Sequence, residues 1–421
     1  MSQTIAEKIL SQHSGREAYA GDIVIADIDY AMSQDGTTPL AIEAFRDMGV
    51  ESVWNPDKIS FVIDHSAPSP SQQVSNLHEM MREFAREQGI NVYDIGCGVC
   101  HQLIPEQGHV VPGDLVVGAD SHTCTYGALN VFSTGIGSTD IAAVYASGKL
   151  WFRVPKTIKI NVEGELSRGV YSKDLILKII GDLTADGATY MSAEFGGEAI
   201  SSLSVEARMT VSNMAVEMGA KAGIMEADSK VMDYVRKHSG REPNTVKADR
   251  DASYSREINL DASDLEPVVA KPHRVDNVVP LSDVEGLEIA EAYLGTCTNG
   301  RLEDLRIAAG ILDGARVGDG VKFIVAPASR QVYLDAINEG LIQSLVRCGA
   351  AVVTPGCGPC VGTHNGVPAD GENVISTANR NFKGRMGNPE AFIYLASPAT
   401  VAASAIKGEI TDPRGLLSKR D

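Results

Sequence analysis

Three cysteines on glycine-rich loops are the residues best suited to chemistry. Cys297 lies in GTCTNG, and Cys357 and Cys360 lie in TPGCGPCVG. Thiolates are soft ligands that suit zinc or an iron–sulfur cluster. The two-residue spacing lets both sulfurs of the pair face one centre, and the flanking glycines let the backbone approach that centre closely. Cys297 can join them only after folding, from the end of another strand.

Several chemistries remain open for these cysteines. A C-x-x-C pair can be a redox disulfide, although that motif normally begins a helix of a small βαβ domain and needs no third cysteine. A zinc site needs a fourth ligand, for which Cys348 or His364 is nearest. Cys297 can also be a small buried residue. A cubane held by three cysteines would leave one iron open, which is what a Lewis acid needs. The other four cysteines are expected in the core or behind the site: Cys97, Cys100, Cys124 and Cys348.

Acidic and histidine side chains follow predicted strands. Asp64 and His65 follow the apolar run ISFVI, His101 lies in GVCHQ, and Asp120 and His122 follow LVVG. A histidine oriented by a carboxylate is a suitable proton donor to a leaving hydroxyl. One such histidine is more often structural, but three at predicted strand ends favour a catalytic site.

The segment NRNFKGR, residues 379–385, carries two arginines in acidic surroundings. Arginine pairs with carboxylates in a bidentate manner, so Arg380 and Arg385 could hold a di- or tricarboxylate. The glycine-rich GIGSTD, residues 135–140, lacks the lysine of a phosphate-binding loop and indicates a turn that leads into a helix.

Short apolar runs alternate with segments of helical period, which is typical of an α/β fold. One helix is expected after Pro70, with Val74, Leu77, Met81 and Phe84 on one face and Gly89 at its end. Ligands of open α/β sheets bind beyond the carboxyl ends of the strands, where these polar loops lie. Strands are expected at residues 59–64, 115–118, 292–295, 322–326 and 350–354.

The 421 residues suit two or three domains, and composition shifts predict segments at 1–154, 155–272 and 273–421. A net charge of −18 argues against nucleic acid as the main partner. No run of about 18 apolar residues predicts a membrane span, and the N-terminus lacks the pattern of a signal peptide. A cytoplasmic location follows as the expectation, where thiols stay reduced.

Taken together, the motifs resemble the aconitase superfamily from about residue 20 to 411. The resemblance implies three α/β domains around a cluster cleft and one [4Fe–4S] cluster with one open iron, held by Cys297, Cys357 and Cys360. It implies proton transfer or catalysis by Asp64, His65, His101, Asp120, His122 and Glu217. It implies substrate contacts from Gln34, within a Gln34–Asp35 pair, and from Ser121, Arg380 and Arg385. Asn213 and Asn379 are expected beside the cluster.

The chain departs from full-length aconitases because it has no room for their fourth, swivelling domain. It resembles instead the large subunits of the two-chain enzymes, the isopropylmalate dehydratases and, as the alternative, the homoaconitases. A separate small subunit is then expected to supply that domain, and a small hydroxy di- or tricarboxylate is the expected substrate. The implied reaction removes water and adds it back, in leucine biosynthesis for the first type. A zinc-stabilised binding module is the alternative of another class.

Overall fold

The apolar runs of the N-terminal third form a five-stranded sheet in the computed structural model, which describes residues 2–417. All its neighbouring strands are parallel, in the order β4-β3-β2-β5-β6. Helices cover it, so β3 and β5 consist of buried residues without alternation. The strands are β2 (Tyr30–Gln34), β3 (Ile59–Val62), β4 (Asn91–Tyr93), β5 (Leu115–Gly118) and β6 (Phe132–Gly135), and the helices are α1 (Ile5–Ser14), α2 (Thr38–Asp47), α3 (Gln72–Gln88), α4 (Cys100–Glu106), η2 (Ser121–Leu129) and α5 (Ser138–Ser147).

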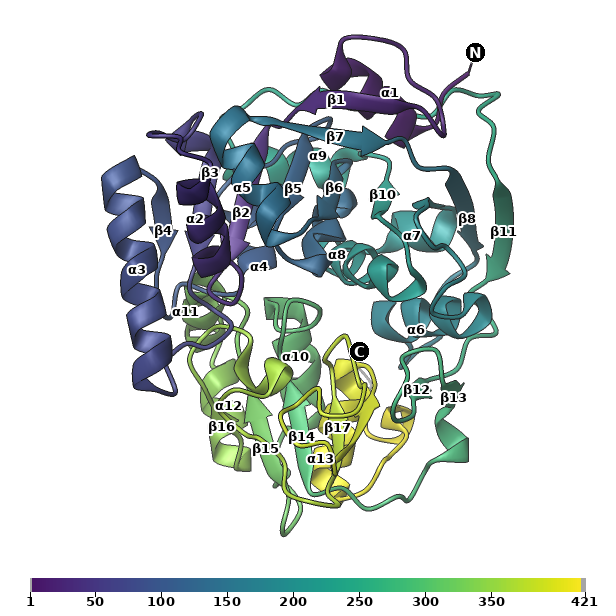
Figure 1. The fold of residues 1–421 in the computed structure, drawn as a ribbon. Coiled ribbons are helices and arrows are strands. Elements are labelled where there is room, and N and C mark those ends of the chain that lie inside the picture. The colour runs from purple at the N-terminus through teal and green to yellow at the C-terminus, as the bar shows by residue number, and fades with distance from the viewer. Residues whose placement is uncertain (1, 418–421) are drawn as a thin grey trace.

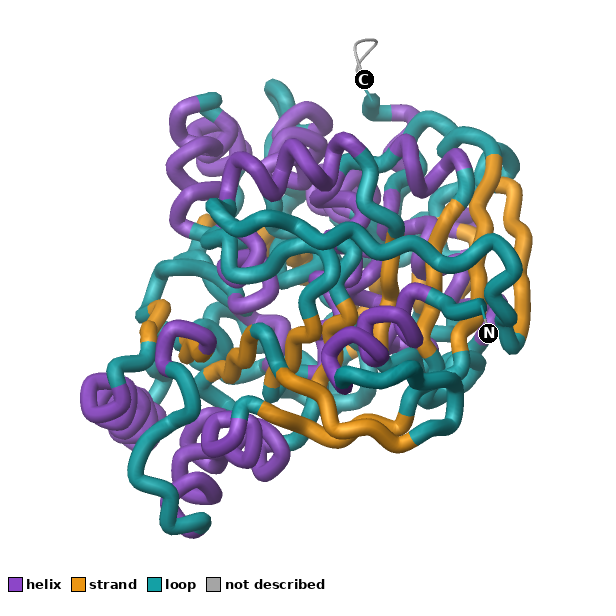
Figure 2. The backbone as a smooth tube through the Cα atoms, turned by 90° about the horizontal axis from the view of Figure 1, so that it is seen from above, coloured by secondary structure: helices purple, strands orange, loops and turns teal. Residues whose placement is uncertain are grey.

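A second parallel sheet follows, in the order β10-β9-β8-β11. Figure 2 shows its strands side by side at the right-hand edge of the molecule. The charged, apolar-poor stretch near residue 250 contributes β11, an edge strand with an exposed pattern. The strands are β8 (Thr157–Glu163), β9 (Ser192–Gly196), β10 (Ala222–Met225) and β11 (Arg256–Asp261), with helices α6 (Ser172–Leu183), α7 (Glu198–Ser202), α8 (Val205–Asn213), η3 (Met214–Met218) and α9 (Ser229–His238).

The third sheet has the order β13-β12-β18-β17-β14-β15-β16 and lies in the lower half of Figure 1. Only β12 and β13 run antiparallel to their neighbours. The strands are β12 (Val268–Ala270), β13 (Val278–Pro280), β14 (Glu291–Leu294), β15 (Lys322–Val325), β16 (Ala351–Val352), β17 (Asn373–Ser376) and β18 (Phe392–Leu395), and the helices are α10 (Leu302–Ile311), α11 (Arg330–Asn338), α12 (Leu341–Cys348), η5 (Gly358–Val361) and α13 (Pro398–Lys407).

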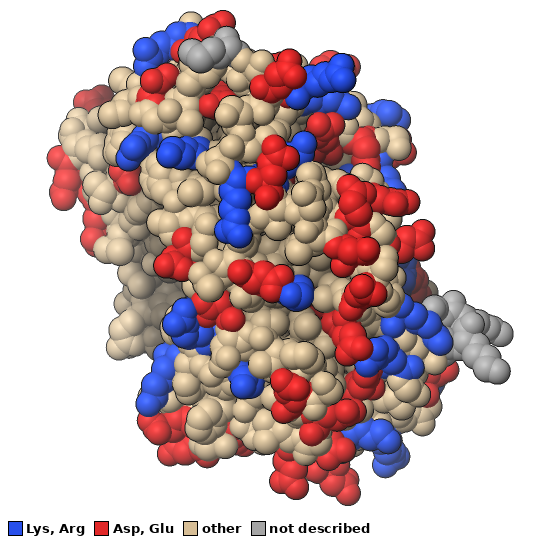
Figure 3. All heavy atoms as spheres, turned by 90° about the vertical axis from the view of Figure 1, so that its right-hand side faces the viewer, with Lys and Arg blue, Asp and Glu red and all other residues tan. Residues whose placement is uncertain are grey.

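The three large sheets confirm the predicted α/β class. One sheet falls in each predicted segment, except that β12, before residue 272, joins the third sheet. The exact domain boundaries stay a prediction, and positions 1 and 418–421 at their outer ends lie outside the described residues. No helix in residues 2–417 has the length and apolar character to cross a membrane. On the right-hand side of the molecule, acidic side chains are spread widely with basic ones between them (Figure 3).

A small antiparallel ribbon lies apart from these sheets. It pairs β1 (Ile23–Asp27) with β7 (Lys149–Arg153) across the top of the molecule in Figure 1. The chain runs from β1 directly into the start of β2, so the ribbon lies at the amino-terminal ends of the first sheet's strands.

Helix α3 begins and ends as predicted but buries a different residue. Gly89 ends it with φ 75°, and Met81 and Phe84 are buried. Leu77 is 39% exposed, so its predicted place in the core was wrong. His78 takes the buried position instead, because its Nε2 reaches the Asp35 carboxylate at 3.1 Å. The contact with Asp35 therefore places His78, rather than Leu77, on the buried face of α3.

The burial difference on α3 predicts unequal costs of truncation. Phe84→Ala should lower the free energy of unfolding by about 3–5 kcal/mol, because it leaves a cavity in a packed core. Leu77→Ala, on the same helix, should cost less than about 1 kcal/mol. Thermal and urea unfolding of both variants measures this. Equal losses would contradict the inward face described here.

Candidate functional site

Loops at the carboxyl ends of two parallel sheets enclose one cavity of about 290 Å³. Gln34, His65 and Asp120 come from the loops and strand ends of the first sheet, and Cys297 and Cys357 from those of the third. Of the predicted site residues, Asp64, Asn213 and Glu217 do not line it and lie behind others that do. Those that line it are Gln34, His65, His101, Asp120, Ser121, His122, Cys297, Cys357, Cys360, Asn379, Arg380 and Arg385.

All three predicted ligand cysteines are buried at this cavity. Gly358 has φ 58°, and a Cβ there would lie 2.7 Å from the Tyr293 hydroxyl, so only glycine fits between the two sulfurs of the pair. That hydroxyl donates to the Cys357 carbonyl at 2.7 Å, which fixes the turn. The need for glycine at position 358 is visible only in the structure, because Tyr293 is far away in sequence.

Hydrogen-bond donors from a neighbouring loop face the sulfurs. Asn379 Nδ2 lies 3.3 Å from Cys297 Sγ, and Arg385 Nη2 lies 3.4 Å from Cys360 Sγ. Two buried polar atoms at the site have no protein partner within the described residues, Arg385 Nε and Asn213 Oδ1. Buried polar groups are rarely left unsatisfied, so this donor set fits a bound polar group together with thiolate ligands.

The spacing of the sulfurs bears on the zinc alternative. Ligands of one tetrahedral zinc at about 2.3 Å lie about 4 Å from one another. Within residues 2–417, three metal-capable side chains approach within 4.8 Å of each other only at Asp64, His65 and Cys100. The three cysteines do not form such a group. Within the described residues, the three sulfurs are therefore not gathered as the ligands of a single tetrahedral zinc.

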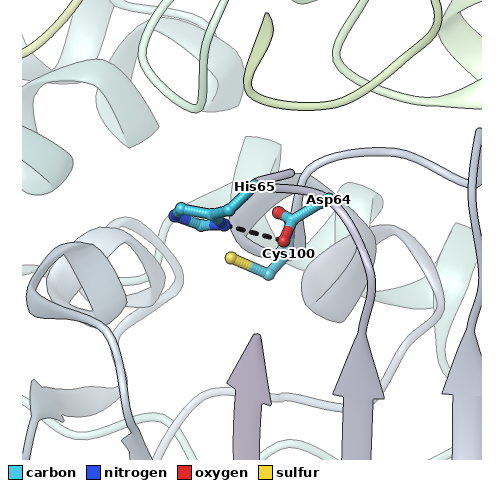
Figure 4. Close-up of side chains that lie close together, drawn as sticks. All are labelled: Asp64, His65 and Cys100. Carbon is cyan, nitrogen blue, oxygen red and sulfur yellow. Dashed lines mark hydrogen bonds and ion pairs between the residues drawn. The ribbon is translucent and has the colours of Figure 1, made fainter. Parts of the chain in front are cut away.

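Asp64, His65 and Cys100 do lie together, as Figure 4 shows. Hydrogen bonds within the protein explain why they lie close together without a metal ion. One oxygen of Asp64 lies 2.8 Å from His65 Nδ1, and the other accepts the backbone N–H of Cys100 at 2.7 Å. Burial raises the pKa of the Cys100 thiol well above its ordinary value. Cys100 is therefore a neutral core thiol, as the sequence predicted.

The Asp120 carboxylate joins the three predicted histidines. It lies 2.8 Å from His101 Nε2 and 3.4 Å from His65 Nε2. It also accepts the backbone N–H of His122 at 2.8 Å as it caps η2. Burial alone would raise the pKa of Asp120, but the hydrogen bonds that it accepts from His101, His122 and His65 hold it well below its ordinary range. Asp120 is therefore an acceptor that fixes each imidazole.

Hydrogen bonding gives two of the histidines different protonation. Both ring nitrogens of His65 face carboxylates, Asp64 and Asp120, so both carry protons. Burial would lower the pKa of His65, but the nearby Cys357 sulfur and these carboxylates hold it well above its ordinary value. Burial lowers the pKa of His101, whose Nδ1 lies 3.2 Å from the Tyr126 hydroxyl. The hydrogen bonds and the raised pKa therefore favour a charged imidazole at His65, and the lowered pKa favours a neutral imidazole at His101.

A second branch connects Asp120 to the other two sheets. His122 Nε2 lies 2.8 Å from Glu217 Oε1, and Arg380 Nε lies 2.7 Å from the same oxygen. Burial would raise the pKa of Glu217, but His122 and Arg380 lower it. The path from Asp64 to Arg380 therefore connects all three sheets through hydrogen bonds and ion pairs. Glu217 is placed to orient His122 and Arg380 rather than to face the cavity.

Two buried charged residues support the site from behind the cavity. The sequence placed Asp35 beside Gln34 at the substrate site and did not mark Arg301. Asp35 accepts the backbone N–H groups of His65 and Ser66, each at 2.8 Å, and binds His78 from α3. Arg301, fully buried, donates to the Cys297 and Thr298 carbonyls at 2.8 and 2.6 Å. A charged residue just before an amphipathic helix normally faces solvent, so no pattern marked Arg301 as buried.

Substitution of Arg301 tests its support of the Cys297 loop. Arg301→Lys should destabilise the chain by about 3 kcal/mol or more, because lysine cannot reach several carbonyls and leaves them buried without donors. Arg306→Lys, five residues along at an exposed Glu339 ion pair, should cost under about 1 kcal/mol. Thermal unfolding of the two variants gives the comparison. Equal melting temperatures would rule out the supporting role.

Comparison with known proteins agrees with this geometry. The family model described as "Aconitase family (aconitate hydratase)" matches residues 7–408. A 3-isopropylmalate dehydratase large subunit of Archaeoglobus fulgidus is 56% identical, and one of Methanopyrus kandleri is 55% identical, each over 99% of this chain and 100% of the relative. A probable methanogen homoaconitase large subunit of Methanothermobacter thermautotrophicus is 52% identical over 98% of both chains.

The aconitase X of Thermococcus kodakaraensis shares the fold, with a TM-score of 0.51 at 13% identity over 87% of each chain. The family match spans nearly the whole chain and includes every residue of the cavity. The chain belongs to the aconitase family.

Proposed function

We propose that this chain is the large subunit of a 3-isopropylmalate dehydratase, a hydro-lyase that interconverts 2- and 3-isopropylmalate by loss and re-addition of water. The observation that carries the proposal is the single cavity in which three buried cysteines face the protonated His65 and two arginines. The relatives at 55–56% identity carry that name. Leucine biosynthesis and a cytoplasmic location follow from the same assignment.

Cys297, Cys357 and Cys360 would hold one [4Fe–4S] cluster, with Asn213 and Asn379 beside it. When bound, such a cluster with one open iron supplies a Lewis acid for the substrate hydroxyl. The buried thiols suit this role because nearby nitrogens can donate to thiolate sulfur. Burial raises the pKa of Cys297 to about 12, so binding of the cluster would have to displace the proton of this thiol.

His65 would donate its proton to the departing hydroxyl, and Asp64 with Asp120 would hold the ring in place. His101 would assist from the other side of Asp120, with a fixed ring and no charge. Two carboxylates against one imidazolium keep the proton available without letting the ring rotate. Removal of either carboxylate would leave a buried cation with one partner.

Arg380 and Arg385 would bind the substrate carboxylates, and Gln34 and Ser121, which line the same cavity, would contact the substrate as well. Arg385 Nε has no protein partner in the described chain, which leaves part of its guanidinium fork for a ligand. Arg380 is already paired with Glu217, so its direction is set before substrate arrives.

A separate small subunit would bring the swivelling domain and the base that removes the carbon-bound proton. The relatives are named large subunits, which implies a second chain in those enzymes. Among the described residues, the one carboxylate that lines the cavity, Asp120, is committed to histidines, so the base is expected from the second chain. The large subunit alone is therefore expected to show little or no turnover.

The homoaconitase reaction is the alternative, because a relative of that name is 52% identical. Assays of the chain with its small subunit, using isopropylmalate or citraconate against homoaconitate, separate the two. Iron, zinc and acid-labile sulfide are measured first on anaerobically purified chain. Zinc without sulfide would remove the hydro-lyase proposal in favour of a zinc-stabilised binding module.

Loss of one ligand should abolish the cluster. Cys357→Ser should reduce bound iron and sulfide to background and bleach the visible spectrum, while the circular dichroism spectrum stays unchanged. Cys348→Ser, at a buried cysteine that donates to the Leu312 carbonyl, is the matched control and should keep its iron. Full cluster occupancy in Cys357→Ser would refute the ligand assignment.

Loss of the planar fork at Arg385 should weaken substrate binding. Arg385→Lys should keep the cluster but lower kcat/KM about 10- to 100-fold, the cost of one charge-assisted bidentate pair. Arg347→Lys, at an exposed position on α12, should leave kcat/KM unchanged. Steady-state kinetics of the two-subunit enzyme provide the test, and unaltered kinetics in Arg385→Lys would exclude carboxylate binding there.

A further inference from the structure

The β1–β7 ribbon has one buried and one exposed face. Both strands alternate, with the first, third and fifth residues of each exposed. Directly paired residues of an antiparallel pair point to the same face. The outer face therefore carries three pairs, which are Ile23 with Arg153, Ile25 with Trp151, and Asp27 with Lys149.

The centre of this outer face is strongly apolar. Ile23, Ile25 and Trp151 are 64%, 66% and 60% exposed, more than every other large apolar side chain described in the structure. Trp151 also lines a pocket of about 170 Å³ with the half-exposed Tyr190, which extends the apolar surface toward the second sheet. Contiguous exposed apolar surface of this kind marks an interaction site.

Charges of both signs border the apolar centre in a fixed order. Asp27 and Lys149 lie at one end, 2.6 Å apart and more than half exposed, and Arg153 lies at the other. A face with an acid and a base side by side on neighbouring strands can be complementary to itself. A complementary partner surface would present a base opposite Asp27 and an acid opposite Lys149. It would also need the same spacing of residues as this ribbon.

We infer that a second copy of this chain covers the ribbon, face to face, about a two-fold axis parallel to its strands. Such an axis places β1 of one copy over β7 of the other without shifting residues along the strands. Each Ile25 then meets Trp151 of the second copy, and each Asp27 meets Lys149 of the second copy. Both contacts occur twice, as an isologous interface requires.

Other arrangements of two copies fit less well. An axis across the strands would place the Asp27 carboxylate against the apolar Ile23 and would bring Lys149 against Arg153, a pair of like charges. Edge-to-edge addition at β1 is opposed by Arg16, whose guanidinium donates to the Ile23 carbonyl at 2.6 Å. The charge pattern therefore selects the face and the direction of the axis.

The ribbon lies at the opposite ends of the first sheet's strands from the cavity. A second copy there leaves the cavity mouth open to a small subunit. The inference goes beyond the proposed function and does not depend on the cluster, so it can fail or hold independently.

The order of charges permits a test by exchange. In a homodimer of the Asp27→Lys variant, the new lysine of each copy would face Lys149 of the other copy. In a homodimer of the Lys149→Asp variant, the new aspartate of each copy would face Asp27 of the other copy. Both variants therefore place like charges at both contacts. Each variant alone should therefore sediment as a monomer, with at least a tenfold weaker dimer Kd than the natural chain. An equimolar mixture of the two should restore dimers, because opposite charges then meet at both contacts.

Analytical ultracentrifugation of the purified full chain across the micromolar range measures this. Asp233→Lys, at the exposed Asp233–Arg236 pair on α9, is the control and should remain dimeric. Trp151→Ser should be monomeric both alone and in mixtures. A monomeric natural chain, or single variants that dimerise normally, would overturn the inference. It would also be overturned if ribbon variants lost binding of the small subunit, since that chain would then be the occupant.

Discussion

The Asp120 carboxylate is the constraint on which the site depends. It is buried at the end of β5 and contacts His65 and His101 from its own sheet. Through His122 it reaches Glu217 beside the second sheet, and Glu217 pairs with Arg380 beside the third. A buried charge is costly unless paired, so each member of this chain of contacts requires the next. The contacts that join the three sheets at the site therefore pass through this carboxylate.

The loops that carry the cysteines are also held by pairing of buried polar groups. Arg301 is buried because the Cys297 loop bends its carbonyls inward, where water cannot satisfy them. Lys173 on α6 similarly donates to the Thr377 and Ala378 carbonyls, just before the Asn379–Arg380 pair. Two buried basic side chains thus donate to both loops that meet at the sulfurs. Loops with this support can keep donors in position before any ligand is present.

The two ends of the first sheet differ in character for a reason of topology. Parallel strands gather their following loops at one end, where polar and charged side chains enclose the cavity. The opposite end receives the connections that return to the sheet, and there the ribbon exposes isoleucines and a tryptophan. The cavity and the surface inferred for self-association therefore lie at opposite ends of the first sheet.

The sequence alone determined the α/β class, most strand positions, and the cysteines, histidines and arginines that line the cavity. These depend on local patterns, such as an apolar run followed by a loop with Asp and His, which survive in any fold that brings strand ends together. The inward face of α3 and the burial of Arg301 were decided by tertiary structure. Leu77 lost its core position because His78 has a partner, Asp35, that is far away in sequence. Arg301 became buried because its guanidinium donates to the nearby Cys297 and Thr298 carbonyls and also to the Gln102 side chain, which is far away in sequence. Local patterns record hydrophobicity and spacing, whereas the pairing of buried polar groups depends on which segments meet in space.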